Sequence, residues 1–599
     1  MSLSMEKRWV LKQYGDRSLV EKLAKELQVG KTSSCPEDLE AYKIIANLLV
    51  QRGINNYDDA KSFFRPKLED LHNPFIMNDM DIAVERVMSA IEKEEKILVY
   101  GDYDVDGTSA VALVYSYLRE IYNGVDFYIP DRYGEGYGVS YKAINWAIEE
   151  DFKLIISLDC GIKAIEQVAY SSSKGIDFII ADHHLPDEEL PKACAVLNPK
   201  RIDTTYPYRE LSGCGVGFKL IHALNIKLGK PFEDIIPYLD LVAIAIAADV
   251  VPITGENRIL AYYGLKVINQ KPRPGLEAIL KYADILHLKD KLKNKLYFKR
   301  ELNINDLVFL ICPRINAAGR IETGNKSVEL LISKDIIGAD KIARKINNNN
   351  DRRKELDILA TEEALEMILN SDDLNTSKAT VAYKEDWNKG IVGIVASRLI
   401  EKFYKPTIVF TKSNDLITGS ARSVKGFDIY SAIESCSHLL EHFGGHKYAA
   451  GLSLKEENLK EFVKLFKEKV GQKIEKHQSS PEIEIDDTIS LREITPKLYR
   501  LLKQFSPFGP DNSIPIFQSN NVVDTGYVRP VGQNHLKFSA IHLDIGHMPF
   551  SCIGFGLSNY YEDMRKGKAF DIVYYIEENE WNGKISLQLN IKDIKLTIK

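Results

Sequence analysis

The segment Ile97-Leu98-Val99-Tyr100-Gly101-Asp102-Tyr103-Asp104-Val105-Asp106-Gly107-Thr108 decides the fold class of this 599-residue chain. Its first four residues form an apolar run that is too short for a helix, and the polar residues after it lead into a helical pattern over Thr108–Tyr122. The apolar runs Leu154–Leu158 and Phe178–Ala181 repeat this order, with a helical pattern over Ile162–Ser172 between them. Short apolar strands that alternate with helices indicate βαβ units and a parallel sheet that is buried on both faces.

Each of the three predicted strands is followed by acidic or imidazole side chains. In chain order they are Asp102, Asp104, Asp106, Asp159, Asp182, His183 and His184. The carboxyl ends of parallel strands meet at one edge of an open sheet, so we expect these side chains to line one crevice. Clustered carboxylates repel one another unless a divalent cation neutralises them, and oxygen with imidazole ligands suits Mn²⁺ or Mg²⁺. More ligands are present than one ion needs, which predicts two ions that activate water against a phosphate.

Three simpler interpretations of the acidic segment are weaker. A calcium EF-hand loop would need a bidentate Glu at its twelfth position, where this chain has Leu113. The nucleophile motif of haloacid-dehalogenase-type phosphatases fits Asp104–Thr108, but it leaves Asp159 and the histidine pair unexplained. A solvated acidic turn does not account for a similar pattern after three successive strands.

The remaining chain predicts further domains around this sheet. The runs Ala379–Tyr383 and Pro406–Phe410 indicate a second α/β unit, and from about residue 480 short alternating strands with an Asn582-Gly583 turn indicate a small all-β barrel. The predicted divisions are an N-terminal helical segment (1–75), a catalytic α/β domain (76–272), a helical connector (273–370), a smaller α/β domain (371–475) and the barrel (476–599).

Composition narrows the class of protein. The chain is 45% hydrophobic and 27% charged, as globular proteins are, and its net charge of −6 argues against a uniformly basic nucleic-acid coat while leaving room for a local basic track. The seven cysteines form no CxxC pair, which fits a reducing compartment rather than a zinc ribbon or a disulfide framework. The apolar run Leu241–Ala248 is far shorter than the ~20 residues of a membrane span. These features predict a cytoplasmic protein without a membrane partner.

Several motifs resemble a known superfamily. Asp104-Val105-Asp106-Gly107, Asp159 and Asp182-His183-His184 resemble motifs I, II and III of the DHH phosphoesterases, and Leu241–Pro252 resembles motif IV, which ends in a metal-binding aspartate, here Asp249. Further segments resemble the RecJ branch, the bacterial single-strand-specific DNA exonucleases; they are Arg314–Arg320, Trp387–Arg398, Gly444–Gly451 and Pro507–Asn512. The resemblance implies a DHH catalytic domain, a DHHA1 domain and a C-terminal OB-fold barrel.

The resemblance also implies roles for individual residues. The ligands of two Mn²⁺ or Mg²⁺ ions would be Asp104, Asp106, Asp159, His183 and Asp249, with Asp159 bridging the ions. Near the scissile phosphate it places His184, Arg314 and Arg320, and Asp102 would orient a ligand or the attacking water. The 5′ end of the substrate would bind Arg132, Ser420 and Arg422, and the strand's phosphates would approach Gly444, Gly445 and His446. Surface ion pairs of the arginines and a tight turn at the glycines are the structural alternatives. Asn388 and Asp511 depart from the usual residues of the branch, which are His and Gly or Glu.

The activity implied is 5′→3′ hydrolysis of single-stranded DNA to mononucleotides in repair and recombination, by a monomer that works with a helicase and a single-strand-binding protein. The alternatives are a DHH-type oligoribonuclease or cyclic-dinucleotide phosphodiesterase, whose chains generally lack the C-terminal β domain, and a non-catalytic replication scaffold, which the complete ligand set disfavours. We interpret the glycine-rich Gly213–Gly217 as a structural turn. The lysine-rich patch around Lys289–Arg300 fits either a DNA track or a solvated helix face.

Overall fold

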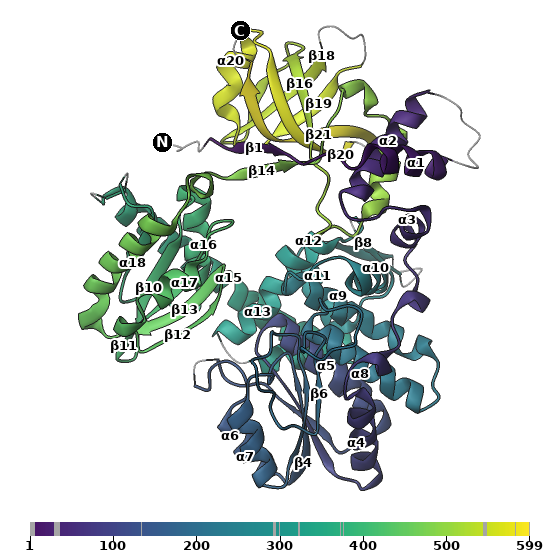
Figure 1. Cartoon of the computed structure of the whole chain (residues 1–599), viewed down its shortest axis with the longest axis vertical. Coiled ribbons are helices and arrows are strands. Elements are labelled where there is room, and N and C mark those ends of the chain that lie inside the picture. Colours follow the sequence, from purple (N-terminus) through teal and green to yellow (C-terminus); the bar gives the residue numbers. More distant parts are fainter. Residues whose placement is uncertain are drawn as a thin grey trace.

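The computed structural model describes residues 6–28, 36–132, 134–290, 295–298, 300–321, 324–371, 373–374, 376–542, 548–581 and 583–597. Figure 1 shows three bodies: the catalytic α/β domain at the bottom, a smaller α/β lobe beside it, and a β-rich domain at the top that lies next to the N-terminal segment. Across the helices that can be described, none is both long and apolar enough to cross a membrane.

A five-stranded parallel sheet forms the centre of the catalytic domain. Its order is β3 (Val125–Tyr128), β2 (Lys96–Gly101), β4 (Phe152–Leu158), β5 (Asp177–Ala181) and β6 (Ala195–Leu197). The predicted parallel sheet is therefore confirmed. The chain order reverses at β2, which pairs with β3 on one side and β4 on the other, so the crevice for ligands opens at the carboxyl ends of β2 and β4.

Helices cover both faces of this sheet. One face packs against α4 (Met80–Glu92), α5 (Val105–Ile121) and α8 (Gly213–Lys227). Behind these, α9 (Leu239–Ala248) packs on α5 and α8, and α10 (Gly255–Gln270) packs on α9. The other face packs against α6 (Tyr141–Glu149) and α7 (Ile165–Ser173). The strands are buried on both sides, which explains their continuous apolar sequence.

The predicted connector does not form a separate unit. It contains α11 (Pro274–Tyr282), the hairpin of β7 (Leu286–Asp290) and β8 (Lys295–Phe298), α12 (Ile304–Asp306), a π-helical turn (Leu307–Ile311), α13 (Cys312–Ile321), α14 (Asn325–Leu331) and α15 (Ile336–Leu369). Its apolar side chains up to Ile346 belong to the catalytic core, whereas Ala360, Ala364 and Ile368 pack into the second lobe. The long helix α15 therefore bridges two cores. The lysine side chains of the predicted patch lie outside the described residues, and Arg300 pairs with Asp306.

The second lobe holds a mixed sheet in the order β12 (His442–His446), β13 (Ala449–Leu454), β11 (Leu416–Arg422), β10 (Thr407–Ser413) and β9 (Thr380–Tyr383). Only the β9–β10 pair among these is parallel. The lobe also contains α16 (Val392–Phe403), α17 (Ile429–Glu434) and α18 (Leu459–Lys473). The predicted second α/β unit is present.

The C-terminal domain is a closed barrel. Its order is β16 (Phe517–Asp524), β20 (Phe570–Trp581), β21 (Lys584–Leu596), β19 (Phe550–Gly554) and β18 (His535–His542), and β18 pairs back to β16. The short strands β15 (Asp487–Thr488) and β17 (Arg529–Val531) extend the sheet, and the helices α19 (Pro496–Leu502) and α20 (Tyr561–Arg565) accompany it. The predicted all-β barrel and its β20–β21 hairpin are confirmed.

The predicted N-terminal helices are present, but the segment also contains a strand that was not predicted. After β1 (Arg8–Leu11) come α1 (Arg17–Gln28), α2 (Pro36–Val50) and α3 (Tyr57–Phe64). Strand β1 pairs in parallel with β14 (Glu482–Ile485), and the helices share one apolar core with the barrel domain. The partner strand lies at the far end of the chain, so no local pattern around Arg8 could reveal this pairing.

Candidate metal centre and phosphate pocket

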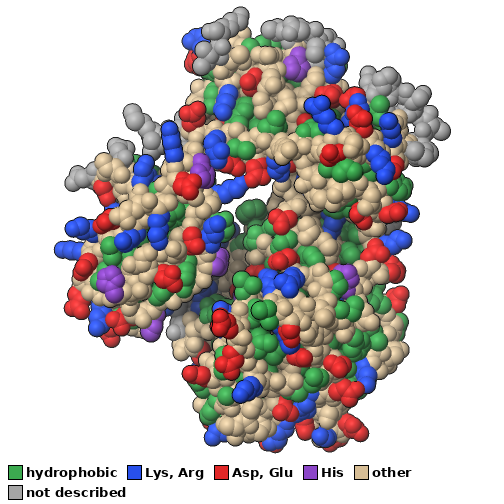
Figure 2. All heavy atoms as spheres, viewed as in Figure 1, with side chains coloured by type: hydrophobic (Ala, Val, Ile, Leu, Met, Phe, Trp, Pro, Cys, Tyr) green, Lys and Arg blue, Asp and Glu red, His purple; other side chains and the backbone are tan. Residues whose placement is uncertain are grey.

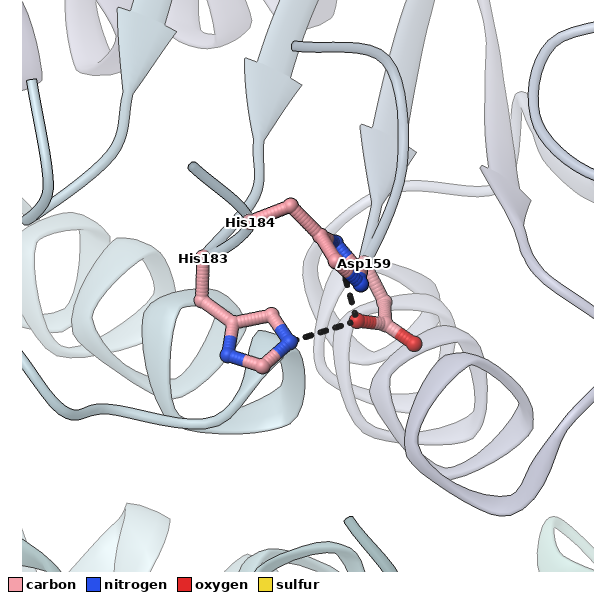
Figure 3. Close-up of side chains that lie close together, drawn as sticks. All are labelled: Asp159, His183 and His184. Atoms are coloured by element: carbon pink, nitrogen blue, oxygen red, sulfur yellow. Dashed lines mark ion pairs between the residues drawn. The ribbon is translucent and has the colours of Figure 1, made fainter. Parts of the chain in front are cut away.

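The buried imidazole of His183 lies at the centre of the acidic crevice. Its Nε2 is 3.2 Å from Oδ1 of Asp159 and 3.5 Å from Oδ2 of Asp249, and it is 4.0 Å from Oδ2 of Asp106. Figure 3 shows His183 and His184, which follow β5, converging on Asp159, which follows β4. Asp249 comes from the end of α9. The structure thus brings together predicted ligands from four separate elements.

Asp104 and Asp106, two of the predicted ligands, follow β2. Asp104 caps the N-terminus of α5, where its Oδ1 accepts a hydrogen bond from the Gly107 N–H at 2.9 Å, and Asp106 lies in the first turn of that helix. Asp102 is buried directly after β2. Burial and the charge of Asp104 raise the pKa of Asp102.

The glycine-rich segment Gly213–Gly217 is part of this site. We interpreted it as a turn, but it forms the first turns of α8, with Ser212 as the N-cap. The main-chain N–H groups of Gly213 and Cys214 donate hydrogen bonds of 2.7 Å to the two carboxylate oxygens of Asp106. A Cβ on Gly213 would lie 2.5 Å from Oδ1 of Asp159. The N-terminus of α8 therefore holds the Asp106 carboxylate, and the lack of a side chain at Gly213 allows the Asp159 carboxylate to approach closely.

Asp182 is buried behind the two histidines and orients them. Its carboxylate accepts hydrogen bonds from the main chain of Ile162 and His183, at 3.0 and 2.7 Å, and from Nδ1 of His184 at 2.7 Å. Although burial alone acts in the opposite direction, the hydrogen bond from His184 lowers the pKa of Asp182 to about 2. The same bond outweighs burial at His184 and raises its pKa to about 9.

His184 is the exposed member of the histidine pair. Its side chain is 42% exposed, whereas that of His183 is 6% exposed. The second ring nitrogen, Nε2, lies 3.2 Å from the hydroxyl of Tyr137. We had not predicted Tyr137, whose only signal is its place in the glycine-rich loop Asp131–Gly138. The ring of His184 is therefore held between Asp182 at Nδ1 and the Tyr137 hydroxyl at Nε2.

The charge balance of the crevice fits a bound divalent cation. Burial and the neighbouring carboxylates raise the pKa of both Asp106 and Asp249 to about 7, and the same causes raise the pKa of Asp159. Oδ1 of Asp159 and both ring nitrogens of His183 are buried without a hydrogen-bond partner. Two groups have ligand atoms within 4.8 Å of one another: Asp159, His183 and His184; and Asp106, His183 and Asp249. Carboxylates and imidazole in this arrangement suit Mn²⁺ or Mg²⁺.

A cationic pocket lies on the second lobe. Ser420 and Arg422 project from the same face of β11, and Nη1 of Arg422 donates to Oγ of Ser420 at 3.0 Å. Gly393, at the start of α16, is so close that a Cβ there would lie 2.9 Å from both side chains. Burial lowers the pKa of Arg422, and the positive charge of Arg132 lowers it further. A guanidinium, a hydroxyl and a helix N-terminus are together a favourable site for a phosphate.

Arg132 lies beside the acidic crevice, next to Tyr103. Its guanidinium stacks 5.0 Å from the ring centre of Tyr103, the residue between Asp102 and Asp104. Its charge acts on the pKa of Asp102 as well as on that of Arg422. Figure 2 shows that a hollow remains between the second lobe and the rest of the molecule when all side chains are drawn.

The other predicted residues have different surroundings. Arg314 donates to the carbonyls of Leu310 and Tyr282 and to Asn347, so its described contacts tie α13 to its neighbours and do not reach the acidic crevice. Arg320 lies in α13, but its side chain is outside the described residues. The three-residue set Gly444, Gly445 and His446 is exposed on the edge strand β12.

The glycines of β12 and the two departures from the family pattern also have local explanations. Gly445 has φ = 144°, and a Cβ there would clash with the main chain of Ala449. The side chain of Asn388 accepts a hydrogen bond from the Gly390 N–H in the turn before α16. Asp511 has φ = 57°, a conformation that glycine adopts more easily.

Comparison with known proteins identifies all three domains. The chain matches the DHH family N-terminal domain over residues 96–246, the DHHA1 domain over 376–472 and the RecJ OB domain over 485–593. Two relatives are named single-stranded-DNA-specific exonuclease RecJ: one from Bacillus subtilis (36% identical, 94% of this chain and 69% of the relative) and one from Escherichia coli (31% identical, 95% and 98%).

Solved structures agree with these matches. The fold is similar to RecJ from Thermus thermophilus in complex with Mn²⁺, with a TM-score of 0.81 at 23% identity over 99% of this chain and 80% of that chain. A crystal structure of exonuclease RecJ bound to manganese matches with a TM-score of 0.57 at 28% identity over 69% of this chain and 98% of that chain. The chain therefore belongs to the RecJ family of single-stranded-DNA-specific exonucleases.

Proposed function

We propose that this protein is a metal-dependent exonuclease that removes mononucleotides from the 5′ end of single-stranded DNA. The observation that carries the proposal is the convergence of Asp106, Asp159 and Asp249 on the buried His183, in a chain whose relatives are named single-stranded-DNA-specific exonucleases. We further propose that Arg422 and Ser420 bind the terminal phosphate of the strand, which would direct the attack to the 5′ end.

The metal ligands in this proposal are Asp104, Asp106, Asp159, His183 and Asp249. Bound Mn²⁺ or Mg²⁺ would supply an activated water and stabilise negative charge on the phosphate. The chain itself prepares these ligands: the N-terminus of α8 fixes the Asp106 carboxylate, and Asp182 fixes the main chain of His183. His184, held by Asp182 on one side, presents Nε2 as a donor to the scissile phosphate.

The substrate is proposed to be a single strand because of the relatives' activity and the barrel domain. OB-fold barrels bind single strands through basic grooves and stacked aromatics. Oligoribonucleotides and cyclic dinucleotides are the alternative substrates, and they belong in the same assay. Three further properties remain predictions: a monomeric state, a cytoplasmic location, and a helicase and single-strand-binding protein as partners. Light scattering tests the monomeric state.

The decisive assay uses strands labelled at either end. Full-length protein is incubated with 5′-labelled or 3′-labelled single-stranded DNA, with duplex and with RNA, in Mn²⁺ or in EDTA. We expect the 5′ label to be released first as a mononucleotide, from single-stranded DNA alone and only with metal. Release of the 3′ label first would refute the polarity, and equal activity in EDTA would refute the metal dependence.

A binding measurement separates metal loading from catalysis. We expect Mn²⁺ to raise the thermal unfolding temperature of the wild-type protein, because a ligand that binds only the native state stabilises it. The matched control is Asp203→Asn, an exposed aspartate that pairs with Arg201 and lies outside the proposed ligand set. This variant should keep the Mn²⁺ response.

A further inference from the structure

A buried arginine joins the barrel domain to the catalytic domain. Arg258 lies on α10 and is 3% exposed. Its Nη atoms donate hydrogen bonds of 2.7 to 3.4 Å to consecutive main-chain carbonyls just after α19, those of Gln504, Phe505, Ser506 and Pro507. Burial lowers the pKa of Arg258 to about 9. A buried guanidinium is tolerated only where hydrogen-bond acceptors surround it, so the contact depends on the positions of these four carbonyls.

The carbonyls belong to a segment that we call the docking loop, residues 504–512. Within the loop, the side chain of Asn512 donates to the carbonyls of Phe505 and Pro507 at 2.8 and 2.9 Å. The loop is therefore closed from its own side by Asn512 and held from the catalytic domain by Arg258. This explains the Pro507–Asn512 motif, which the proposed chemistry does not use.

The docking loop also contacts the chain shortly before Arg258. The Ile253 N–H donates to the Pro510 carbonyl at 2.8 Å. A Cβ on Gly509 would lie 2.4 Å from Cγ1 of Ile253, so the close contact requires glycine at that position. Ile253 and Arg258 together bind the barrel domain to both ends of the segment 253–258.

This segment begins beside a proposed metal ligand. Val250, which directly follows Asp249, has φ = 59°. A β-branched residue rarely adopts this left-handed conformation, and such strain persists only where the surrounding structure enforces it. On one side Asp249 is bonded to the last turn of α9, its N–H donating to the Ala245 carbonyl at 2.9 Å. On the other side the Pro252 carbonyl accepts hydrogen bonds from Asn257 and Tyr208, and the docked segment begins at the next residue, Ile253.

We propose that Arg258 is a positioning residue for the metal centre. By clamping the docking loop against residues 253–258, it keeps Val250 in its left-handed conformation and the Asp249 carboxylate within 3.5 Å of His183. The barrel domain thereby contributes to the metal centre without touching it. This inference rests on the proposed function, because the position of Asp249 matters only if it is a ligand.

The test compares two arginines that hold the same loop. Arg52, from the N-terminal segment, donates to Oδ1 of Asn512 and to the Ser513 carbonyl at 3.2 and 2.9 Å. In the full-length protein we expect Arg258→Gln to weaken Mn²⁺ binding about 10-fold, the lower end of the range for residues that orient a ligand. Arg52→Gln loosens the same loop from the other side and should leave Mn²⁺ affinity near the wild-type value. Calorimetry measures the affinity, and thermal unfolding reports the loss of stability in each variant.

A second substitution distinguishes positioning from general loosening. In the Arg258→Gln background, Val250→Gly should restore part of the Mn²⁺ affinity, because glycine adopts the left-handed conformation without strain. A purely structural role predicts no such recovery. If Arg258→Gln does not fold, Gly509→Ala carries the same test, since the added Cβ displaces the loop from Ile253 and leaves Arg258 intact.

The possible outcomes separate the two proposals. Wild-type protein that binds no Mn²⁺ overturns the proposed metal centre and this inference with it. Normal Mn²⁺ affinity in Arg258→Gln, or equal losses in Arg258→Gln and Arg52→Gln, overturns the inference alone. A selective loss in Arg258→Gln with recovery by Val250→Gly supports it.

Discussion

The proposed metal centre and the proposed phosphate pocket carry opposite charges and are built in opposite ways. The centre gathers carboxylates from the ends of β2, β4 and α9 around the buried His183. The pocket takes Ser420 and Arg422 from one face of the single strand β11. One site therefore depends on the relative placement of several elements, and the other needs only the alternation of side chains along a strand.

The two sites also differ in how they accommodate their own charge. In the metal centre, burial and mutual repulsion of the carboxylates raise the pKa of Asp106 to about 7, while two main-chain N–H groups hold its oxygens. In the pocket, Arg422 bonds to Ser420 within the same strand. We therefore expect substitutions in the metal centre to affect every substrate, and substitutions in the pocket to affect only the recognition of the 5′ end.

The largest effect is expected for Asp159→Ala. It removes the carboxylate beside both histidines, so the loss of nuclease activity should exceed the ~10- to 100-fold typical of residues that only orient a ligand. Without metal, the unfolding temperature should stay the same or rise, because the substitution removes one buried carboxylate from a group of carboxylates that repel one another. Activity and thermal unfolding with and without Mn²⁺ measure both effects. Retained activity would show that the crevice is not the centre of the chemistry.

Gly213→Ala tests the close approach between α8 and Asp159. The added Cβ would lie 2.5 Å from the Asp159 carboxylate, so we expect Mn²⁺ affinity to fall by about 10-fold or more. Calorimetry with Mn²⁺ measures it. Gly175→Ala is not a suitable control because its φ is positive, but Gly471→Ala is, since a Cβ there meets nothing within 4 Å. Equal affinities in both variants would contradict the proposed packing.

Arg422→Ala tests the pocket by itself. A charge-assisted hydrogen bond contributes about 1.5–3 kcal/mol, so kcat/KM on a 5′-phosphorylated strand should fall about 10-fold or more. On a strand with a 5′-hydroxyl end the loss should be smaller, and Mn²⁺ affinity should not change. Steady-state kinetics on the two strands measures the difference. An equal loss on both would place Arg422 outside 5′-phosphate recognition.

Tyr137→Phe should have the smallest effect. It removes the hydroxyl that lies 3.2 Å from Nε2 of His184 but keeps the ring, and a single hydrogen bond of this kind contributes about 0.5–1.5 kcal/mol. We expect kcat to fall by less than about 10-fold, with Mn²⁺ affinity unchanged. A larger loss than that of Arg422→Ala would reverse the order predicted here and assign Tyr137 a direct role.

The parts of the fold that follow from local patterns were predictable. The strands β2, β4 and β5, the barrel hairpin and the second α/β unit each show their own periodicity or turn signal. The pairing of β1 with β14 and the division of α15 between two cores were not predictable, because both depend on partners far away in the chain. The glycines at 213–217 were misread for the same reason: their partner, Asp106, lies on another helix.

The edge of the sheet at which Asp106, Asp159 and His183 meet could be predicted from the chain, because carboxylates and histidines directly follow three parallel strands. Asp249 follows no strand, and only the family resemblance pointed to it. The distances between these ligands could not be predicted, since Asp249 reaches His183 only when α9 packs against α5 and α8. Tertiary structure alone decided that Tyr137 meets His184, that Arg132 stacks on Tyr103 and that Arg258 holds the barrel domain. The physical reason is that side-chain chemistry is a local property, whereas burial and separation depend on how distant segments pack.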